Sequence, residues 1–274
     1  IRKDIVSGII VALVSIPISM GYAQIAGLPA VYGLYCSILP VLIYGLVTSS
    51  PQFVFGVDAT PAALVGGTLA TLGIVSGSEE AKAVVPSITL VAALWLLLFF
   101  FIKAGRIVNY ISTPVMGGFI SGIGVTIILM QAAKLFGGNA GTGEAIKLLM
   151  HIAGEMKSFN LLSAVLGVGT VIIILIAKKF IPKFPMSVLL MVLGALATAI
   201  FHIDRCGVKL LPHVDKGLPG FSLPDMSVVF KNPSEIILLG LSVAGVVMAQ
   251  TLLATNNYAN KYGYKVSNNR EILS

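Results

Sequence analysis

Two features that could bind a ligand or exchange a proton lie close together in this sequence: an acid, Asp58, and a helix start at Thr60 and Pro61. Thr60 offers a hydroxyl for the N-cap and Pro61 fits the first helical position, so a helix is predicted to begin here. Its free N–H groups and the positive end of its dipole could bind an anion. If the stretch lies within a membrane, Asp58 could also exchange a proton, because a carboxylate is costly there when charged.

The segment that carries these residues, 51–75, is too short to cross a bilayer as one helix. From Thr60 to Val75 a helix rises about 22 Å, against a hydrocarbon core of about 30 Å. The residues before it, Phe53 to Gly56, favour an extended chain. Two interpretations stay open: a half-helix of the kind that membrane transporters place at an anion site, or an ordinary junction of loop and helix with a capping acid.

The composition is that of an integral membrane protein. Hydrophobic residues make up 57% of the 274 residues and charged residues 11%, with a mean hydropathy of +0.97. The apolar runs are longer than the ~10-residue alternation of a membrane barrel. The net charge of +7 is explained by basic loops beside a membrane and does not require a nucleic-acid-binding surface. Cys36 and Cys206 lack metal-ligand spacing and are expected to be ordinary thiols.

Seven full membrane spans and one partial span are predicted from the apolar runs. The full spans are 5–24, 31–48, 84–102, 114–136, 161–177, 186–201 and 235–255, and the partial span lies within 51–75. Pro17 is expected to interrupt and loosen the first span. By this count Asp58 is the one acid of eleven that lies in the apolar zone, which indicates a functional site.

The distribution of basic residues favours an N-terminus in the cytoplasm. The segments on that side then hold ten of the eighteen basic residues: Arg2, Lys3, Lys103, Arg106, Lys178, Lys179, Lys183, Lys261, Lys265 and Arg270. We therefore expect a multi-pass protein of the plasma or inner membrane with this orientation.

Other site chemistry finds little support in the sequence. His151, His202 and His213 have no ligand spacing, so no metal site is expected. No Ser/His/Asp set, phosphate-binding loop or HExxH motif is present. These observations argue against an enzyme and against a resident cofactor.

Several stretches resemble the signature of the sulfate permease (SulP) family of anion transporters. The run from Ile16 to Tyr35 reads IPISMGYAQIAGLPAVYGLY and matches the family's proline-containing first span, its Ala-Gly-Leu-Pro turn and its Gly-Leu-Tyr second span. Further matches are Thr48-Ser49-Ser50 followed by Gly56 and Ala59, then Gly217-Leu218-Pro219, and finally Asn269-Arg270-Glu271-Ile272-Leu273. The resemblance extends over the whole chain.

The resemblance implies an all-α membrane fold of fourteen segments in a seven-plus-seven inverted repeat, of which this chain would hold the first eight. Core segments would lie in 1–104 and 235–256, and gate segments in 105–203. The chain starts at Ile1 with Arg2 and Lys3 before an apolar run, so we interpret it as a trimmed piece without a cleaved signal peptide. Segments 9–14, a cytoplasmic STAS domain and the contacts of a homodimer are expected outside it.

The function implied by the resemblance is secondary active transport of a small anion by an elevator-like motion of core against gate. Sulfate, bicarbonate, chloride and dicarboxylates are the candidate substrates. We expect Tyr22, Ala59, Thr60, Ala62 and Gln250 to bind the anion between two facing half-helices. Asp58 is expected to carry the coupling ion, a proton, with sodium as the alternative.

Three positions depart from the family pattern. Ile18 stands where many members have Gln after the proline, Asp58 stands where many have an apolar or aromatic residue, and Gln250 stands where many have an acid. An acid has in effect moved from one wall of the site to another.

Rival functions also remain open at this stage. A nucleobase or ascorbate carrier of the same fold is one, although the Gly-Leu-Tyr and Asn-Arg-Glu-Ile-Leu matches disfavour it. A sodium-coupled anion symporter is a second rival. An anion channel is a third, and it would conduct without saturating or exchanging.

Overall fold

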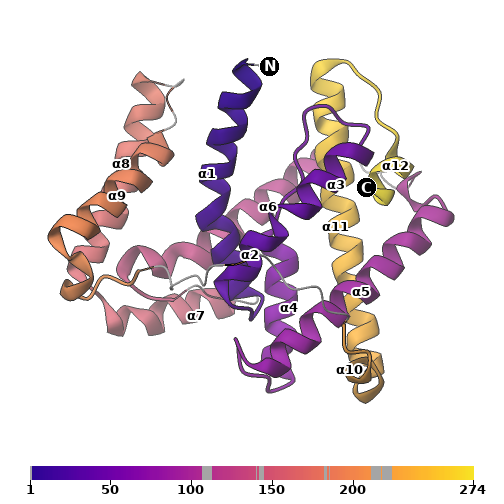
Figure 1. Cartoon of the computed structure of the whole chain (residues 1–274), viewed down its shortest axis with the longest axis horizontal. Helices are drawn as coiled ribbons and strands as arrows, with labels where there is room; N and C mark the ends of the chain where they lie inside the picture. The colour runs from indigo at the N-terminus through magenta and orange to yellow at the C-terminus, as the bar shows by residue number, and fades with distance from the viewer. Residues whose placement is uncertain are drawn as a thin grey trace. The chain divides into compact units, whose positions relative to one another are not determined.

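The computed structural model describes residues 2–106, 113–139, 141, 145–181, 184, 186–210, 217 and 224–274, and these residues form helices and loops without a strand. The chain divides by its contacts into two units (Figure 1). Unit 1 comprises residues 1–18 and 125–214, and unit 2 comprises residues 19–124 and 215–274. Each unit is described by itself.

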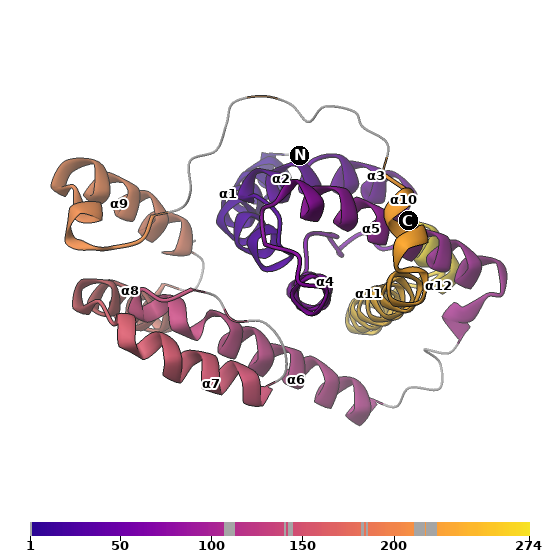
Figure 2. The same cartoon turned by 90° about the horizontal axis from the view of Figure 1, so that it is seen from below.

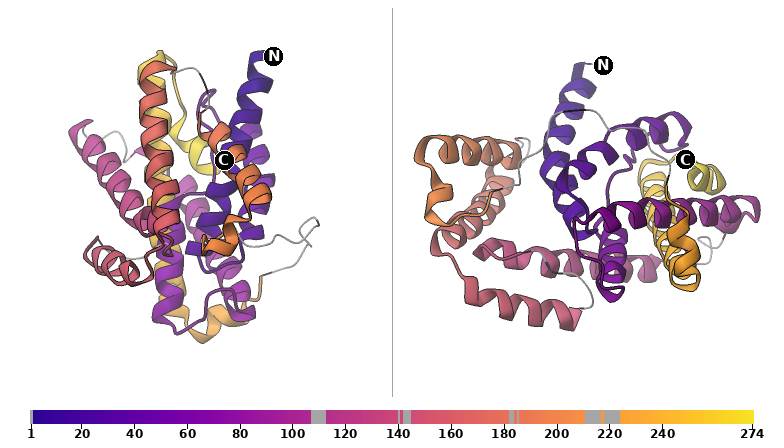
Figure 3. Two further views of the ribbon diagram at one scale, coloured as in Figure 1. Left: turned by 90° about the vertical axis from the view of Figure 1, so that its left-hand side faces the viewer. Right: turned by 60° about the horizontal axis from the view of Figure 1, so that its bottom comes forward.

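Unit 2 holds the half-helix and the helices around it. Its helices are α2 (Ala30–Cys36), α3 (Leu39–Val47), α4 (Ala59–Thr71), α5 (Glu79–Phe101), α10 (Ser227–Lys231), α11 (Pro233–Tyr262) and α12 (Asn268–Leu273). It also includes the end of α1 (Arg2–Ile25) and the start of α6 (Thr113–Ala132). Figure 2 shows α4 and α11 nearly end-on, and α12 turns back beside α11 (yellow in Figure 3).

The core of unit 2 lies where α4, α5 and α11 meet. Leu69 of α4, Ile88 of α5 and Ile236 of α11 are almost fully buried in one cluster. Gly240 permits the close approach of α11 to α5, since a Cβ there would lie 2.6 Å from a methyl carbon of Val91. Packing of this kind, with small residues at the contact, is what holds helices together in a bilayer.

A second set of close contacts joins the end of α1 to α2 and α4. A Cβ at Gly33 of α2 would overlap the carbonyl of Ser19, and a Cβ at Gly66 of α4 would overlap the carbonyl oxygen of Ile25. The Ser19 hydroxyl also lies 2.6 Å from the Ser37 hydroxyl. These contacts fix the position of α4 against the chain segment that carries Tyr22.

Glu271 of α12 ties the C-terminal end of unit 2 to the end of α3. The carboxylate is only 3% exposed and accepts hydrogen bonds from Tyr44 (2.6 Å), Thr48 (2.9 Å), and both the backbone N–H and the hydroxyl of Ser49 (2.6 Å each). Burial by itself would raise the pKa of Glu271. The hydrogen bonds from Ser49, Tyr44 and Thr48 outweigh burial and lower that pKa below its ordinary value.

This Glu271 cluster reaches the segment before α4 through Tyr44. The ring of Tyr44 stacks on Phe55 with 5.3 Å between ring centroids, and it meets Phe53 edge-on at 5.8 Å. The extended chain that leads to Asp58 is therefore held by aromatic contacts to α3.

Unit 1 is built on the later helices. It contains η2 (Ala133–Phe136), α7 (Ala145–Glu155), η3 (Met156–Ser158), α8 (Leu161–Phe180), α9 (Met186–Phe201) and η4 (Ile203–Cys206), with residues 2–18 of α1 and 125–132 of α6. Asn160 caps α8 by accepting a hydrogen bond from the Ser163 N–H (2.8 Å), and its amide donates to the Cys206 carbonyl (2.9 Å). One side chain thus joins the start of α8 to η4.

The helices agree with the predicted spans in part. In the described part of the chain, five helices are long and apolar enough to cross a membrane: Asp4–Ile25, Ala30–Val47, Glu79–Phe101, Leu161–Phe180 and Pro233–Tyr262. Gly124–Phe136 and Met186–Phe201 are apolar but shorter. α9 has 16 residues and a length of about 24 Å, less than the bilayer core of about 30 Å.

The predicted span 31–48 is confirmed as an apolar stretch, Ala30–Val47, that is long enough to cross a membrane. Within it the helix is interrupted between α2 and α3, because Pro40 near the start of α3 cannot donate a backbone hydrogen bond to the preceding turn. The predicted interruption of the first span at Pro17 is wrong. Pro17 lies inside α1, which continues as a helix to Ile25. The boundary between the two units falls directly after it, at Ile18 and Ser19.

Helix α7 and helix α12 were not anticipated. The stretch 145–155, between the predicted spans 114–136 and 161–177, forms an eleven-residue helix that buries Leu148 and exposes Ile146 and Met150. The segment around Gly217-Leu218-Pro219 lies largely outside the described residues.

Candidate functional site

The half-helix is present as α4, which spans Ala59–Thr71. Its thirteen residues rise about 20 Å, so it cannot cross a bilayer. The N-cap residue is Asp58, with extended backbone at φ −123° and ψ 142°. The predicted N-cap, Thr60, was wrong. Pro61 therefore occupies the third helical position, where its missing N–H has no intrahelical partner to lose.

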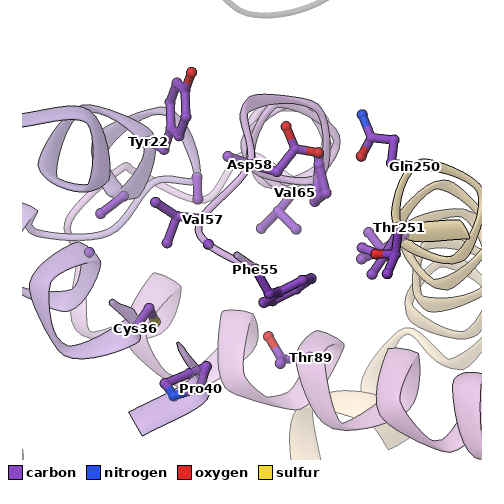
Figure 4. Close-up of a pocket in the computed structure, with 18 of the residues that line it drawn as sticks. Tyr22, Cys36, Pro40, Phe55, Val57, Asp58, Val65, Thr89, Gln250 and Thr251 are labelled. Atoms are coloured by element: carbon purple, nitrogen blue, oxygen red, sulfur yellow. The ribbon is translucent and has the colours of Figure 1, made fainter. Parts of the chain in front are cut away.

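A cavity of about 640 Å³ lies at the N-terminal end of α4, wholly within unit 2 (Figure 4). The end of α1, α2, the extended segment before α4, α4 itself, α5 and α11 all contribute to its wall. Its polar side chains belong to Tyr22, Tyr32, Cys36, Asp58, Thr89, Gln250 and Thr251. The rest of the lining is almost entirely apolar. A cavity of this size with few polar groups is typical of a small-molecule site.

Asp58 lies between Tyr22 and Gln250 in Figure 4. Its half-buried carboxylate is close enough to the Ala59 and Thr60 N–H groups and to the Gln250 amide to interact with them electrostatically. It is also near enough to Tyr22 for its charge to act on that phenol. The carboxylate thus lies beside the N–H groups at which the sequence predicts an anion.

The predicted site residues occupy different places around this cavity. Tyr22, Asp58, Ala62 and Gln250 line it. Thr60 lies beside it, and its hydroxyl accepts a hydrogen bond from the Gln250 amide at 3.3 Å, which links α4 to α11 across 190 residues of sequence.

Ala59 does not line the cavity: it is 1% exposed and packs beneath the helix start.

The polar groups of Cys36, Thr89 and Thr251 were not predicted. Thr89 and Thr251 sit in apolar spans without any local signal, and only the packing of α5 and α11 brings them to the cavity.

The cavity lining contains no Lys, Arg or His. Attraction for an anion at this place would therefore have to come from the free N–H groups and dipole of α4. A helix N-terminus can hold an anion in this way. A charged Asp58 would compete with a bound anion for the same N–H groups.

An all-helical membrane chain with a half-helix at a largely apolar cavity is the architecture of a membrane transporter, and not of an enzyme. The whole chain, residues 1–274, matches the family profile described as the sulfate permease family. The chain therefore belongs to that family.

Two curated relatives illustrate the match. The chain is 26% identical over 273 residues to a probable sulfate transporter of Mycobacterium tuberculosis, covering 99% of this chain and 48% of the relative. It is 28% identical over 288 residues to sulfate transporter 2.2 of Arabidopsis thaliana, covering 100% of this chain and 42% of the relative. The chain thus spans less than half the length of these relatives.

Solved structures share the fold. The murine anion transporter Slc26a9 in its inward-facing state matches with a TM-score of 0.81 and 21% identity, over 100% of this chain and 48% of that one. The transmembrane domain of the cyanobacterial bicarbonate transporter BicA matches with a TM-score of 0.77 and 19% identity, over 97% and 67%. The predicted fold class, the first part of this transporter architecture with a broken third segment, is confirmed.

Proposed function

We propose that the whole protein is a secondary active transporter of a small anion that binds at the N-terminal end of α4. The observation that carries this proposal is the cavity of about 640 Å³, which has a free helix end and no basic side chain in its lining. Relatives named for sulfate and a structural neighbour named for bicarbonate support an inorganic oxyanion. Chloride and dicarboxylates are the remaining candidates.

The substrate is tested by counterflow. Whole protein in liposomes preloaded with one unlabelled anion should take up the labelled form of the true substrate, and uptake should saturate. Sulfate, bicarbonate, chloride and a dicarboxylate form the panel, with uracil and ascorbate as the controls for the same-fold carriers. Conduction that neither saturates nor exchanges would identify a channel and contradict the proposal.

Asp58 supplies the coupling in this proposal. Its charged carboxylate lies beside the N–H groups of Ala59 and Thr60, and it repels an arriving anion. Protonation removes that repulsion. Anion and proton then each favour binding of the other, which is the linkage that symport requires.

Sodium is the alternative coupling ion, because the Gln250 amide lies beside Asp58 and could add a second oxygen ligand. An imposed sodium gradient at equal pH distinguishes the two. Uptake driven by sodium alone would favour the sodium site, whereas uptake driven only by a pH gradient favours the proton.

The transport cycle we propose moves a core, residues 1–104 and 235–256, against a gate, residues 105–203, in an elevator-like motion. The N-terminus lies in the cytoplasm, and the whole protein forms a homodimer in the plasma or inner membrane. Cysteine accessibility at Lys265→Cys, tested with an impermeant thiol reagent added on either side of the membrane, checks the orientation. Labelling from the outside would contradict it.

A further inference from the structure

A second cavity of unit 2, of about 400 Å³, lies away from α4 where α5 ends against α11 and α12. Its wall is formed mainly by polar side chains, among them Lys103, Arg106, Asn256, Asn268 and Asn269. The proposed transport function uses none of them.

The two basic side chains of this cavity lack an acidic partner among the described residues. The acid Glu79 at the other end of α5 is paired with Lys82. Positions 107–112 that follow Arg106 contain no acid either. The nearest acid in sequence on α12 is Glu271, and its carboxylate is fully engaged by Tyr44, Thr48 and Ser49 of another element.

The wider surroundings are basic as well. Residues 98–106 and 248–274, which form the ends of α5 and α11 and all of α12, include five basic residues, Lys103, Arg106, Lys261, Lys265 and Arg270, against the single acid Glu271. Such a distribution attracts anions to this end of the unit.

The amide groups of the wall are fixed in place. Asn256 donates to the Asn268 side-chain oxygen at 2.8 Å, and Asn268 donates to the Gly105 carbonyl at 3.2 Å. A Cβ at Gly105 would lie 3.1 Å from Asn268 and from Ile272, so a larger residue there would displace these neighbours by a few tenths of an ångström.

One group in the wall is not accounted for by the fold. The side-chain oxygen of Asn269 is buried without a hydrogen bond in the described structure. Lys103 has φ +56° because it follows the C-cap of α5, where a left-handed residue ends the helix and directs the chain into the wall of the cavity. The Asn269 oxygen beside the cavity is therefore available to a ligand.

We propose that this cavity binds the phosphate group of a phosphomonoester in its singly protonated form, with Lys103 and Arg106 as the cationic ligands and the Asn269 side-chain oxygen as the acceptor for the phosphate O–H. The planar guanidinium of Arg106 can donate two parallel hydrogen bonds to phosphate oxygens, and the Lys103 ammonium adds a point charge. The volume admits a phosphate and part of the group that it esterifies.

The phosphomonoester could come from an anionic lipid headgroup or from a soluble molecule. Basic residues at the ends of membrane helices favour anionic lipid through the surface potential of the membrane. Two arms of one experiment therefore separate the sources.

The lipid arm uses the whole protein in nanodiscs of phosphatidylcholine with added phosphatidic acid. Native mass spectrometry counts the phosphatidic acid retained per protein. The soluble arm titrates phenyl phosphate by calorimetry into protein in pure phosphatidylcholine, in an Ala62→Leu background that obstructs the cavity at α4.

The test variant is Lys103→Gln with Arg106→Gln, and its matched control is Lys261→Gln with Lys265→Gln. The control removes the same charge from the same end of the unit but from outside the cavity. We expect the test variant to weaken binding about tenfold or more in whichever arm the wild type binds, and the control to change it less than about twofold. Arg106→Lys should give an intermediate loss, since it keeps the charge without the planar fork.

Binding in the lipid arm alone would assign the site to a headgroup, and binding in the soluble arm alone to a dissolved phosphomonoester. Absence of binding in both arms would overturn the proposal. Equal losses in the test and control variants would also overturn it, because they would mean diffuse attraction. Neither result depends on which anion is transported.

Discussion

Ala62 lies in the first turn of α4 and lines the cavity with a single methyl group. A leucine there would fill the space beside the free N–H groups. We predict that Ala62→Leu raises the dissociation constant of the transported anion about tenfold or more, equivalent to ~1.4 kcal/mol. Substrate titration of the purified protein measures this effect.

Ala70→Leu is the matched control for Ala62→Leu, because Ala70 is exposed on the same helix and lies outside the cavity. Its affinity should equal that of the wild type. Equal affinities for Ala62→Leu and the wild type would show that the anion does not bind at this end of α4. Ala59→Leu is a poorer test, since Ala59 is 1% exposed and the larger side chain would disturb packing.

At the scale of elements, the position of α4 depends on Gly66. A methyl group at Gly66 would overlap the Ile25 carbonyl oxygen, whereas nothing lies within 4 Å of a Cβ at Gly67. We predict that Gly66→Ala lowers the free energy of unfolding by about 1–3 kcal/mol, the range for overpacked cores. Gly67→Ala should be neutral or slightly stabilising, because alanine favours a helix. Thermal unfolding in detergent compares the two, and equal midpoints would contradict the close packing of α4 on α1.

The Glu271 cluster joins two elements, α12 and the end of α3, through hydrogen bonds. Glu271→Gln would leave the donors of Ser49, Tyr44 and Thr48 facing a neutral group with its own N–H donors. We predict a loss of about 2–4 kcal/mol, since buried hydrogen bonds to a charged group are involved. Glu80→Gln, at an exposed residue, is the control. A thermal midpoint within a degree of the control would show that the cluster is not stabilising.

The same cluster gives a pH dependence with a defined sign. The pKa of Glu271 is lower in the folded protein than its ordinary value of 4.5. Its contribution to stability is therefore present above pH 4.5 and is lost as the pH falls through the lower, folded-state pKa. The wild type should lose stability over that acidic window more steeply than Glu271→Gln, as thermal midpoints measured from pH 7 to pH 3 would show. Parallel curves would contradict the assignment.

The elements that could be predicted from sequence are those set by local patterns. Long apolar runs predicted the spans over α1, α5, α8 and α11, and the shortness of the run after Thr60 predicted the half-helix. The break at Ser37 was missed because the apolar run continues through it, and only Pro40 signals it. The start of α5 at Glu79 lies before the predicted start at 84, because Glu79 and Glu80 form the first turn of the helix and not a loop.

The site was less accessible to sequence reasoning than the fold. Tyr22 and Gln250 were expected at the cavity from the resemblance to a family, and they line it. The Asp58 carboxylate lies near the N–H groups of its own helix because α4 starts at Ala59, two residues before the expected first helical residue, Pro61. Thr89 and Thr251 reach the cavity only through the packing of α5 and α11, which no local pattern encodes.

At the scale of the whole molecule, the first question is what this chain does by itself. It spans 48% and 42% of two curated relatives, and the family resemblance assigns the facing half-helix to a later segment. We predict that the 274-residue chain expressed alone gives no saturable anion uptake in liposomes, whereas the whole protein does. Saturable uptake by the chain alone would contradict the two-half site.

Uptake under an imposed pH gradient shows whether Asp58 couples anion uptake to protons. Liposomes with the whole protein should accumulate labelled anion when the outside is acidic, because protonation of Asp58 favours anion binding there. Asp58→Asn should abolish this accumulation while anion exchange at equal pH continues. Wild-type uptake that is indifferent to the pH gradient, or Asp58→Asn protein that still accumulates anion, would contradict the account.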